Sequence, residues 1–293
     1  MRAERAEAPV PGEGELLVRA EAIGVTLPTV RKARETAGPI VLGGEVAGTV
    51  VAAGPGVTEF AVGERVTGLC FADAYAQFVV LGAAMASRIP ADASAVDAVA
   101  LVRGGLVARG ACEAGRIDKG DAVLVTAAAS GVGTLAVQLA RQAGAGRVTA
   151  AVGSAAKSGF VLGLGADAVV TYDDPDWGGP FDVVLDGVGG DLLGPAVRAL
   201  GTGGRLVAFG SGGGTVEAYE LLLRGASVIG FQMRHLAFGR PELCARWRDE
   251  LWRQRADGTL RTAVHAEIPL AEAARAHALI EQRRNLGKVV LVP

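Results

Sequence analysis

The residues of this sequence that are most clearly arranged for chemistry form a glycine-rich turn. Gly131, Gly133 and Ala136 fit the spacing G-x-G-x-x-[G/A], which taken alone is a weak signal. Here the apolar run 122–126 precedes the turn and an amphipathic pattern over 132–143 follows it. Gly131 permits the tight turn, Gly133 lets a pyrophosphate approach the backbone, and the N–H groups at a helix N-terminus attract anions. The turn therefore predicts a dinucleotide-binding site; a glycine-rich turn without a ligand is the weaker alternative.

The residues after the next predicted strand indicate which nucleotide binds. Sites for NAD usually carry an Asp or Glu about 20 residues after the first glycine, where it binds the ribose 2′-hydroxyl. No acidic residue occurs between Gly131 and Asp167, and Lys157 lies in that stretch. Small side chains and a lysine suit a 2′-phosphate, which a carboxylate would repel. The pattern favours NADPH over NADH, although a solvated helix lysine is the alternative interpretation of Lys157.

The elements around the turn predict two kinds of domain. The first hundred residues read as strands with no long helix between them, which predicts an antiparallel, barrel-like domain. From about Ala98 strands alternate with helices, which predicts a parallel sheet covered on both faces. The expected strands are 16–25, 45–53, 64–69, 74–81, 122–126, 147–152, 168–172, 182–188, 205–210 and 226–231, and the expected helices are 132–143, 154–164 and 192–200. In the tail, a polar amphipathic helix and the stretch 268–282 precede a final strand, 288–292, that could return to the first sheet.

Composition limits the classes of function. The net charge of −2 over 293 residues gives no electrostatic reason to propose nucleic acid or an anionic membrane as a partner. No apolar run reaches the roughly 18 to 20 residues that span a bilayer, and residues 1–15 lack the apolar core of a signal peptide. The three cysteines are scattered and predict neither a disulfide framework nor a structural zinc site. These features predict a soluble, cytoplasmic protein.

Several motifs resemble those of the zinc-independent, quinone oxidoreductase-like branch of the medium-chain dehydrogenase/reductase superfamily. The resemblance runs over nearly the whole chain. Its most specific stretch is T-A-A-A-S-G-V-G at 126–133, followed by A-V-Q-L-A at 136–140; supporting blocks are 44–48, 63–66, 164–167, 186–189 and 203–205. The resemblance implies an α/β protein. A GroES-like β-barrel catalytic domain would cover 1–98 and 239–293, and a Rossmann domain with a doubly wound parallel sheet, binding NADP(H), would cover 99–238.

The resemblance also implies which residues hold the cofactor. The turn Ser130, Gly131, Val132 and Gly133 would receive the pyrophosphate. The 2′-phosphate would be surrounded by Gly153, Ser154, Lys157 and Tyr172, although packing is the alternative role for Tyr172. Gly187, Val188, Phe209, Gly210 and Ser211 would line the path of the cofactor towards the nicotinamide. Phe231, Asn285 and Lys288 would complete the cradle, that is, the set of residues around the bound cofactor.

The chemistry is where this chain departs from the family pattern. Zinc-dependent relatives carry metal ligands at the positions of Thr26 and Gly44, so no catalytic zinc is expected here. Quinone reductases of the branch typically carry an Asn and a Tyr where this chain has Thr26 and Arg31, and a Thr where it has Val107. Thr26 could give a hydrogen bond and Arg31 a positive charge to a developing enolate, with protonation from water. A solvated basic loop is the alternative for Arg31.

The resemblance implies hydride transfer from NADPH to a small-molecule substrate with a conjugated carbonyl: an enone, a quinone or an enoyl thioester. It also implies a homodimer. Because the Asn, Tyr and Thr are absent, two alternatives stay open. One is a redox-neutral cyclase or isomerase on the same fold, in a biosynthetic pathway for example, and the other is a non-catalytic NADPH-binding protein. The sequence does not name the substrate.

Overall fold

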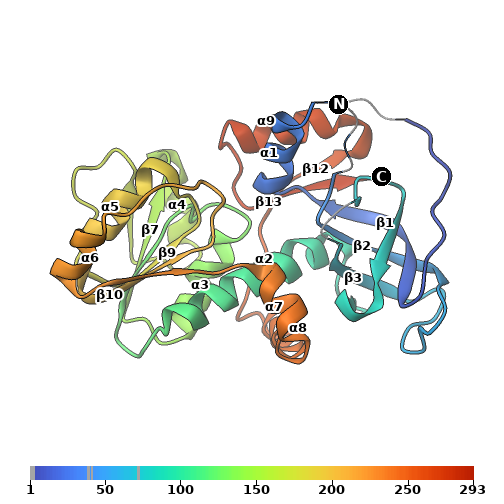
Figure 1. Cartoon of the computed structure of the whole chain (residues 1–293), viewed down its shortest axis with the longest axis horizontal. Helices are drawn as coiled ribbons and strands as arrows, with labels where there is room; N and C mark the ends of the chain where they lie inside the picture. The colour runs from blue at the N-terminus through green and yellow to red at the C-terminus, as the bar shows by residue number, and fades with distance from the viewer. Residues whose placement is uncertain (1–3, 38–39, 41, 71–72) are drawn as a thin grey trace. The chain divides into compact units, whose positions relative to one another are not determined.

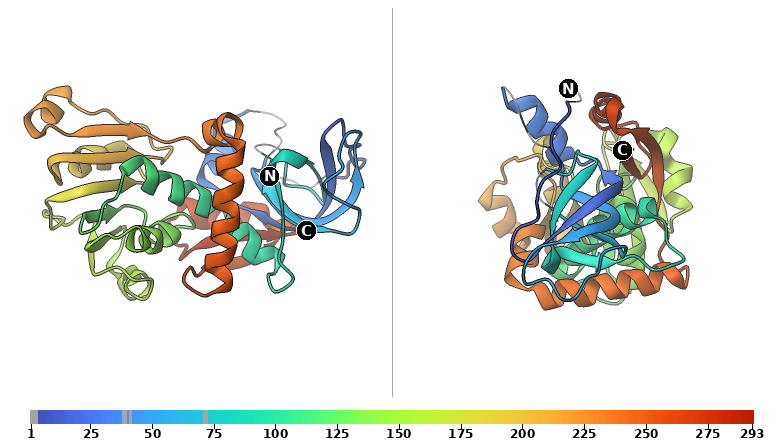
Figure 2. Two further views of the ribbon diagram at one scale, coloured as in Figure 1. Left: turned by 90° about the horizontal axis from the view of Figure 1, so that it is seen from below. Right: turned by 90° about the vertical axis from the view of Figure 1, so that its right-hand side faces the viewer.

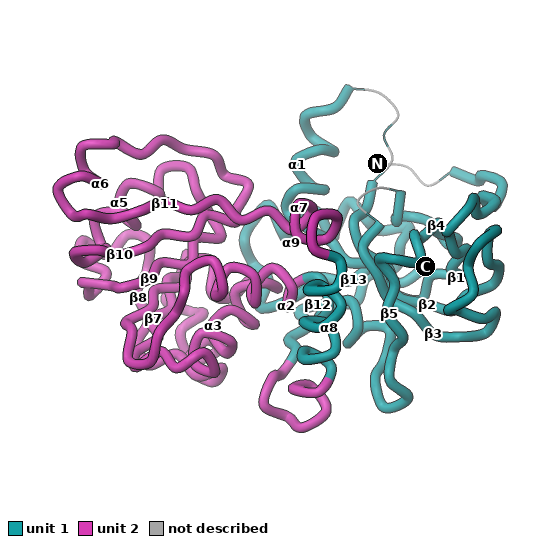
Figure 3. Tube along the Cα trace, turned by 60° about the horizontal axis from the view of Figure 1, so that its bottom comes forward, with its two compact units in different colours: residues 1–103, 241–252, 262–293 teal, residues 104–240, 253–261 magenta. Residues whose placement is uncertain are grey.

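The structure is a computed structural model of the chain, and it describes residues 4–37, 40, 42–70 and 73–293. The chain forms two compact units (Figure 3). Unit 1 contains residues 1–103, 241–252 and 262–293, and unit 2 contains 104–240 and 253–261. The chain passes from unit 1 to unit 2 after Arg103, inside the long helix α2 (Ala95–Gly115), whereas the sequence predicts the boundary after residue 98. The chain passes back to unit 1 at Pro241, whereas the sequence predicts residue 239, and residues 253–261 belong to unit 2.

Unit 1 is built on a seven-stranded sheet in which β1 has the most neighbours. The order is β12-β13-β1-β2-β3-β5, and β4 also pairs with β1. Figure 1 labels β1, β2, β3, β12 and β13 of this sheet. All pairs are antiparallel except β12 with β13. The strands are β1 (Glu15–Gly24), β2 (Glu45–Ala53), β3 (Arg65–Leu69), β4 (Phe78–Gly82), β5 (Ala86–Arg88), β12 (Val264–Pro269) and β13 (Lys288–Val292). The final strand thus returns to the first sheet, as predicted.

The core of unit 1 is aliphatic and comes from the inward positions of these strands. Leu16, Val18 and Ile23 of β1 are fully buried with Val46 of β2 and Leu291 of β13. Helix α9 (Ala273–Glu281) contacts β12 and β13, and helix α1 (Leu27–Glu35) contacts α9. The side chains that alternate along the strands therefore bury one face, which the apolar patterning indicated.

Helix α1 was not predicted. The alternative interpretation of Arg31 placed it in a solvated basic loop, whereas residues 27–35 form a helix capped by Thr26 with Pro28 in its first turn. Both residue types favour a helix start at these positions. The helix is nine residues long, and Thr29 and Val30 are its buried residues, so the apolar periodicity that indicates a helix is almost absent.

Unit 2 contains a six-stranded parallel sheet in the order β11-β10-β9-β6-β7-β8. The strands are β6 (Ala122–Val125), β7 (Arg147–Val152), β8 (Ala168–Thr171), β9 (Phe181–Asp186), β10 (Leu200–Ala208) and β11 (Ser227–Gly230). The chain winds outwards from β6 to β8 and then outwards on the other side from β9 to β11. This is the doubly wound Rossmann order, and ligands of such sheets bind outside the carboxyl ends of the strands where the order reverses. In unit 2 the reversal lies between β6 and β9.

Helices cover both faces of this sheet. Helix α2 packs at Gly115 against Val183 and Val207, whereas Val184 packs with the helix α5 residues Leu193 and Val197 on the other face. Figure 1 shows α5 and α6 on one side of the strands and α2 and α3 on the other, and Figure 2 (left) shows the second pair towards the viewer. The helices of unit 2 are α3 (Gly133–Gln142), α4 (Ser158–Leu162), α5 (Leu193–Arg198), α6 (Ala218–Arg224) and α7 (Met233–Gly239). Most of α8 (Pro241–Ala256) belongs to unit 1. No helix in the described ranges is long and apolar enough to cross a membrane.

Candidate cofactor and active site

The glycine-rich turn lies where β6 ends and α3 begins, at the carboxyl edge of the parallel sheet. Ser130 Oγ accepts a hydrogen bond from the Gly133 N–H at 3.0 Å, and α3 begins at Gly133. A Cβ on Gly133 would collide with the Ala127 carbonyl oxygen and lie 2.7 Å from the Ala128 Cα, so only glycine fits. The predicted residues Ser130, Gly131, Val132 and Gly133 thus form a tight turn at a helix N-terminus. Such a turn fits a pyrophosphate.

Tyr172 connects this turn to the next strands. Its hydroxyl oxygen accepts a hydrogen bond from the Ala127 N–H at 3.0 Å. Ala127 has a φ of 50°, a left-handed conformation that is uncommon for alanine and that this bond helps to hold. The Tyr172 ring lies 3.5 Å from where a Cβ of Gly153 would be. Tyr172 therefore contacts one residue of its predicted subsite, Gly153, and also stabilises the glycine-rich turn.

Gly153, Ser154 and Lys157 follow β7, the strand beside β6. Ser154 Oγ accepts a hydrogen bond from the Ala156 N–H at 3.3 Å and begins a single 3₁₀ turn, Ala155–Lys157. The Lys157 side chain is half-buried, while Gly153 and Ser154 are exposed. The end of β7 is adjacent to the end of β6 because the two strands pair in parallel register. The fold therefore places Lys157 on the segment next to the glycine-rich turn.

A buried carboxylate organises the end of β9. Asp186 is fully buried, and its oxygens accept hydrogen bonds from Thr126 Oγ1 at 2.7 Å, from the Val188 N–H at 3.2 Å and from the Gly189 N–H at 2.9 Å. Thr126 Oγ1 accepts in turn from the Gly187 N–H at 3.0 Å. A buried carboxylate needs such donors. Asp186 and Thr126 hold the turn after β9 at the point of strand reversal, and the sequence had indicated no role for either.

The predicted nicotinamide-side residues of unit 2 meet at the ends of β9 and β10. The Phe209 ring lies 3.0 Å from the Cβ position of Gly187, and a Cβ on Gly210 would lie 2.7 Å from the Val188 nitrogen. Ser211 follows and is exposed. These five residues are therefore neighbours, and their part in binding a nicotinamide stays a prediction.

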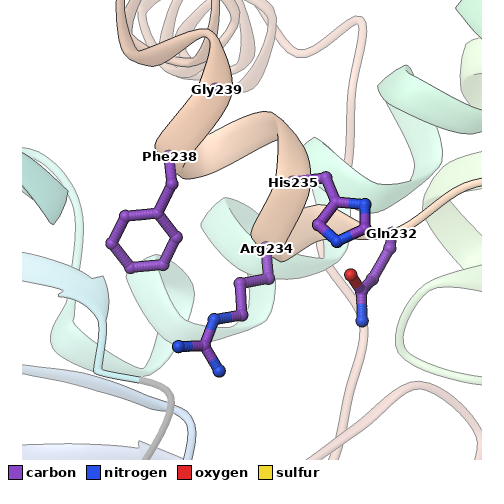
Figure 4. A pocket seen from close by; sticks show the side chains of 5 residues that line it. All are labelled: Gln232, Arg234, His235, Phe238 and Gly239. Atoms are coloured by element: carbon purple, nitrogen blue, oxygen red, sulfur yellow. The ribbon is translucent and has the colours of Figure 1, made fainter.

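Phe231 and helix α7 follow the last strand of unit 2. The Phe231 ring is turned towards α2, because it fills the space in which a Cβ of Gly110 would lie. Beyond it, Gln232, Arg234, His235, Phe238 and Gly239 line an open hollow of about 770 Å³ (Figure 4). The Arg234 guanidinium lies 5.5 Å from the centre of the Phe238 ring, a cation–π contact. The wall of this hollow combines hydrogen-bond donors with an aromatic face.

The two predicted catalytic residues lie at α1 in unit 1. Thr26 is the N-cap, and its hydroxyl lies 2.9 Å from Thr29 Oγ1 and 3.4 Å from the Thr29 nitrogen, from which it accepts a hydrogen bond. Arg31 is a half-exposed residue of the helix. The Thr26 hydroxyl thus stabilises the start of a helix, and a catalytic role for Thr26 or Arg31 stays a prediction.

Unit 1 also buries a charged pair. Glu45 on β2 forms an ion pair with Lys288 on β13, and their side chains are 2% and 9% exposed. Burial lowers the pKa of Lys288, and the Glu45 carboxylate opposes that shift. Asn285 donates to the Gly287 carbonyl at 2.9 Å. Lys288 thus binds Glu45 inside unit 1, and the assignment of Asn285 and Lys288 to the cofactor cradle stays a prediction.

Arg103 of α2 lies beside this pair. A Cβ on Gly44 would collide with Arg103 Nη1 and lie 3.5 Å from its Cζ, so the guanidinium takes the space that a side chain at position 44 would need. Its positive charge acts on both Lys288 and Cys70. Within the described part of the chain, no group of three or more His, Cys, Asp or Glu residues could hold a metal ion. Sequence patterns had not indicated Arg103, because its partner position lies far away in the sequence.

Comparisons with known proteins agree with this architecture. An alcohol dehydrogenase GroES-like domain model matches residues 12–96, and a zinc-binding dehydrogenase model matches 164–291. The probable quinone oxidoreductase of Schizosaccharomyces pombe is 34% identical over 272 residues, which are 87% of this chain and 80% of that protein. The 2-haloacrylate reductase of a Burkholderia species is 32% identical over 97% of this chain and 92% of its own length. The structure of Escherichia coli quinone oxidoreductase complexed with NADPH superimposes with a TM-score of 0.91 at 29% identity, covering 100% of this chain and 95% of that one.

A GroES-like unit and a doubly wound Rossmann unit in one chain define a medium-chain dehydrogenase/reductase fold. The predicted fold class is therefore confirmed. Within that superfamily, the chain belongs to the zinc-independent, quinone oxidoreductase-like branch.

Proposed function

We propose that this protein is an NADPH-dependent reductase that adds hydride to a conjugated carbonyl compound, such as an enone, a quinone or an enoyl thioester. The observation that carries the proposal is the turn Ser130–Gly133 at the point of strand reversal, with Lys157 on the neighbouring segment. Its backbone suits a pyrophosphate, and the lysine suits a 2′-phosphate. The relatives support the choice, because one is named a quinone oxidoreductase, another a 2-haloacrylate reductase, and a third was solved with NADPH.

The residues of unit 2 have separate tasks in this function. When bound, NADPH supplies the hydride. The turn at Gly133 would bind the pyrophosphate, and Tyr172 would keep Ala127 in the conformation that the turn needs. Asp186 and Thr126 would hold the Gly187–Gly189 turn in place for the nicotinamide half. Fixed positions matter because hydride transfer requires the two carbon atoms to be close and aligned.

A labelling experiment tests the reaction. With NADPH deuterated at C4, the label should appear at the β-carbon of the product, and one NADPH should be oxidised per product, across a panel of enones, quinones and enoyl thioesters. A product that carries no label while NADPH stays unoxidised would replace this proposal with the redox-neutral cyclase or isomerase. NADPH binding with no product from any substrate would favour the non-catalytic alternative.

The 2′-phosphate assignment predicts a cofactor preference. NADPH should bind at least about tenfold more tightly than NADH, or about 1.4 kcal/mol, which is modest for one charged hydrogen bond. Titration by nicotinamide fluorescence measures both affinities. Lys157→Ala should remove most of the preference by weakening NADPH and not NADH, whereas Lys119→Ala, an exposed lysine of the same unit, should leave it unchanged. Equal affinities of the wild type for NADPH and NADH, or an unchanged preference for NADPH in Lys157→Ala, would show that this lysine does not bind the 2′-phosphate.

We further propose a homodimer that pairs at the edge of the unit 2 sheet. Strand β11 is an edge strand, and an unpaired edge can pair with a second copy. Apolar side chains near it are exposed, namely Val228 on β11 and Tyr219, Leu222 and Leu223 on α6. Exposed apolar groups of this kind mark interaction surfaces. A cytoplasmic location stays a prediction.

A further inference from the structure

Asp186 is a buried carboxylate of unit 2 whose partners in the described chain are all neutral. It is the last residue of β9 and is fully buried. Its oxygens accept hydrogen bonds from Thr126 Oγ1, the Val188 N–H and the Gly189 N–H, and no Lys, Arg or His in the described ranges forms an ion pair with it. Both oxygens act as acceptors, as those of an ionised carboxylate do. The hydrogen bonds offset part of the cost of burial, but the negative charge remains.

The buried carboxylate of unit 1 is different in this respect. Glu45 forms an ion pair with Lys288, and both side chains are buried. Such a pair is neutral as a whole, so the two opposite fields largely cancel beyond it. The field of Asp186 is not cancelled in this way. A charge in a site from which water is excluded acts over several ångströms, because little solvent screens it.

The order of the strands determines where this charge lies. The glycine-rich turn follows β6, Lys157 follows β7 on one side of β6, and β9 pairs with β6 on the other side. With the pyrophosphate at the turn and the 2′-phosphate towards β7, the nicotinamide half of the cofactor would extend towards the end of β9. The Asp186 carbonyl oxygen also accepts hydrogen bonds from the Phe209 and Gly210 N–H groups at 3.0 and 3.1 Å. The charge therefore lies at the base of both turns that would receive the nicotinamide ring.

We propose that the negative charge of Asp186 favours the oxidised form of the cofactor and thereby promotes the departure of hydride, an inference that rests on the proposed function. The nicotinamide ring of NADPH is neutral, whereas that of NADP⁺ is positively charged. When hydride leaves C4 of the ring, its electron pair forms the C–H bond at the β-carbon of the substrate. The π electrons of the C=C bond move to the carbonyl oxygen, and a proton from water completes the α-carbon, so the conjugated carbonyl is reduced as NADPH is oxidised.

The carboxylate can act on this charge without moving. Three hydrogen bonds from neutral donors already fix it in place. A charge that is fixed before the reaction needs no reorganisation while the opposite charge develops, and this is the condition under which electrostatic stabilisation is most effective. The same charge should make the bound state of NADP⁺ more favourable relative to that of NADPH, which can be measured without any substrate.

The relative affinity for the two cofactor forms tests the proposal. Asp186→Asn keeps the size of the side chain and removes its charge, so the ratio of the Kd for NADP⁺ to the Kd for NADPH should rise at least about fivefold, or about 1 kcal/mol. Isothermal titration calorimetry measures both constants. Asp182→Asn is the matched control, because Asp182 is an exposed residue near the other end of β9, and its ratio should equal that of the wild type.

A second variant separates charge from geometry. Thr126→Val removes the hydroxyl that bonds to Asp186 and to the Gly187 N–H, so it disturbs the same turn while Asp186 keeps its charge. With one donor fewer on the carboxylate, the Kd ratio should move in the opposite direction, in favour of NADP⁺, by about twofold. A purely structural role for Asp186 would move the ratio in the same direction in both variants, or would weaken the binding of both cofactor forms equally.

The outcomes separate the possible failures. An unchanged ratio in Asp186→Asn overturns the inference, and so does an equally large shift in Asp182→Asn. If Asp186→Asn does not fold, Thr126→Val decides, and a ratio that stays unchanged or moves in favour of NADPH overturns the inference. A wild type that binds neither NADP⁺ nor NADPH contradicts the proposed function and this inference together. A wild type that binds both, with the expected shifts in the variants, but reduces no conjugated carbonyl contradicts the proposed reaction and leaves the effect of the charge established.

Discussion

Replacement of Gly133 by alanine should abolish tight binding of NADPH. The added Cβ would collide with the Ala127 carbonyl oxygen and lie 2.7 Å from the Ala128 Cα, both of them backbone atoms of the turn. Backbone cannot swing aside as a flexible side chain can, so the turn must rebuild, and its N–H groups then no longer converge on the pyrophosphate. Affinity for NADPH should fall at least about hundredfold, or about 2.7 kcal/mol, in a fluorescence titration.

Gly159→Ala is the matched control for this substitution. Gly159 lies in α4 of the same unit, and a Cβ there meets no atom within 4 Å. The control should bind NADPH as the wild type does. Overpacking at Gly133 should also lower the stability of unit 2 by about 1–3 kcal/mol, so binding is compared at a temperature where circular dichroism shows both variants folded. If Gly133→Ala binds NADPH within threefold of the wild type, the turn is not the pyrophosphate site, and the proposed function loses its main support.

The second large effect concerns stability. Lys288→Met should lower the free energy of unfolding by about 3–5 kcal/mol, because it leaves the buried Glu45 carboxylate without its cation. Glu45 Oε2 already lacks a hydrogen-bond partner, and the loss of Lys288 would remove the hydrogen bond to Oε1 as well. Urea unfolding followed by tryptophan fluorescence measures the change, since Trp247 and Trp252 are buried residues of unit 1.

Two further variants give this prediction its control. The double variant Glu45→Leu/Lys288→Met should recover most of the loss, because an apolar pair needs no desolvated charge. Arg275→Met removes the cation of an exposed pair with Glu272, whose side chains are 62% and 47% exposed, and should cost under about 1 kcal/mol. A Lys288→Met protein as stable as Arg275→Met would mean that solvent reaches Glu45 and that the pair is not a buried one.

Strands and the glycine-rich turn could be predicted from sequence because their signals are local. Strands β2, β7 and β13 have the predicted bounds, since each is a mostly apolar run with glycine beside it. Helix α2 was not predicted, although it has 21 residues. Most of its residues are Ala, Val, Leu or Gly and are buried around the helix, so the apolar stripe that marks a surface helix is missing. Strand β12 was not predicted, because half of its residues are exposed and no apolar run marks it.

The residues proposed to bind the pyrophosphate could be predicted from sequence because the turn's chemistry comes from neighbouring residues. Gly131, Gly133 and the start of α3 follow one another, so their backbone conformations alone would make the proposed site. The groups that hold or complete the site come from contacts between distant residues. Tyr172 reaches Ala127 across 45 positions, Asp186 reaches Thr126 across 60, and Lys288 reaches Glu45 across 243. The Arg103 guanidinium likewise lies beside Gly44, which is distant in the sequence, because glycine has no side chain to fill that space. Such pairs depend on sheet order and strand register, which no local pattern in the chain encodes.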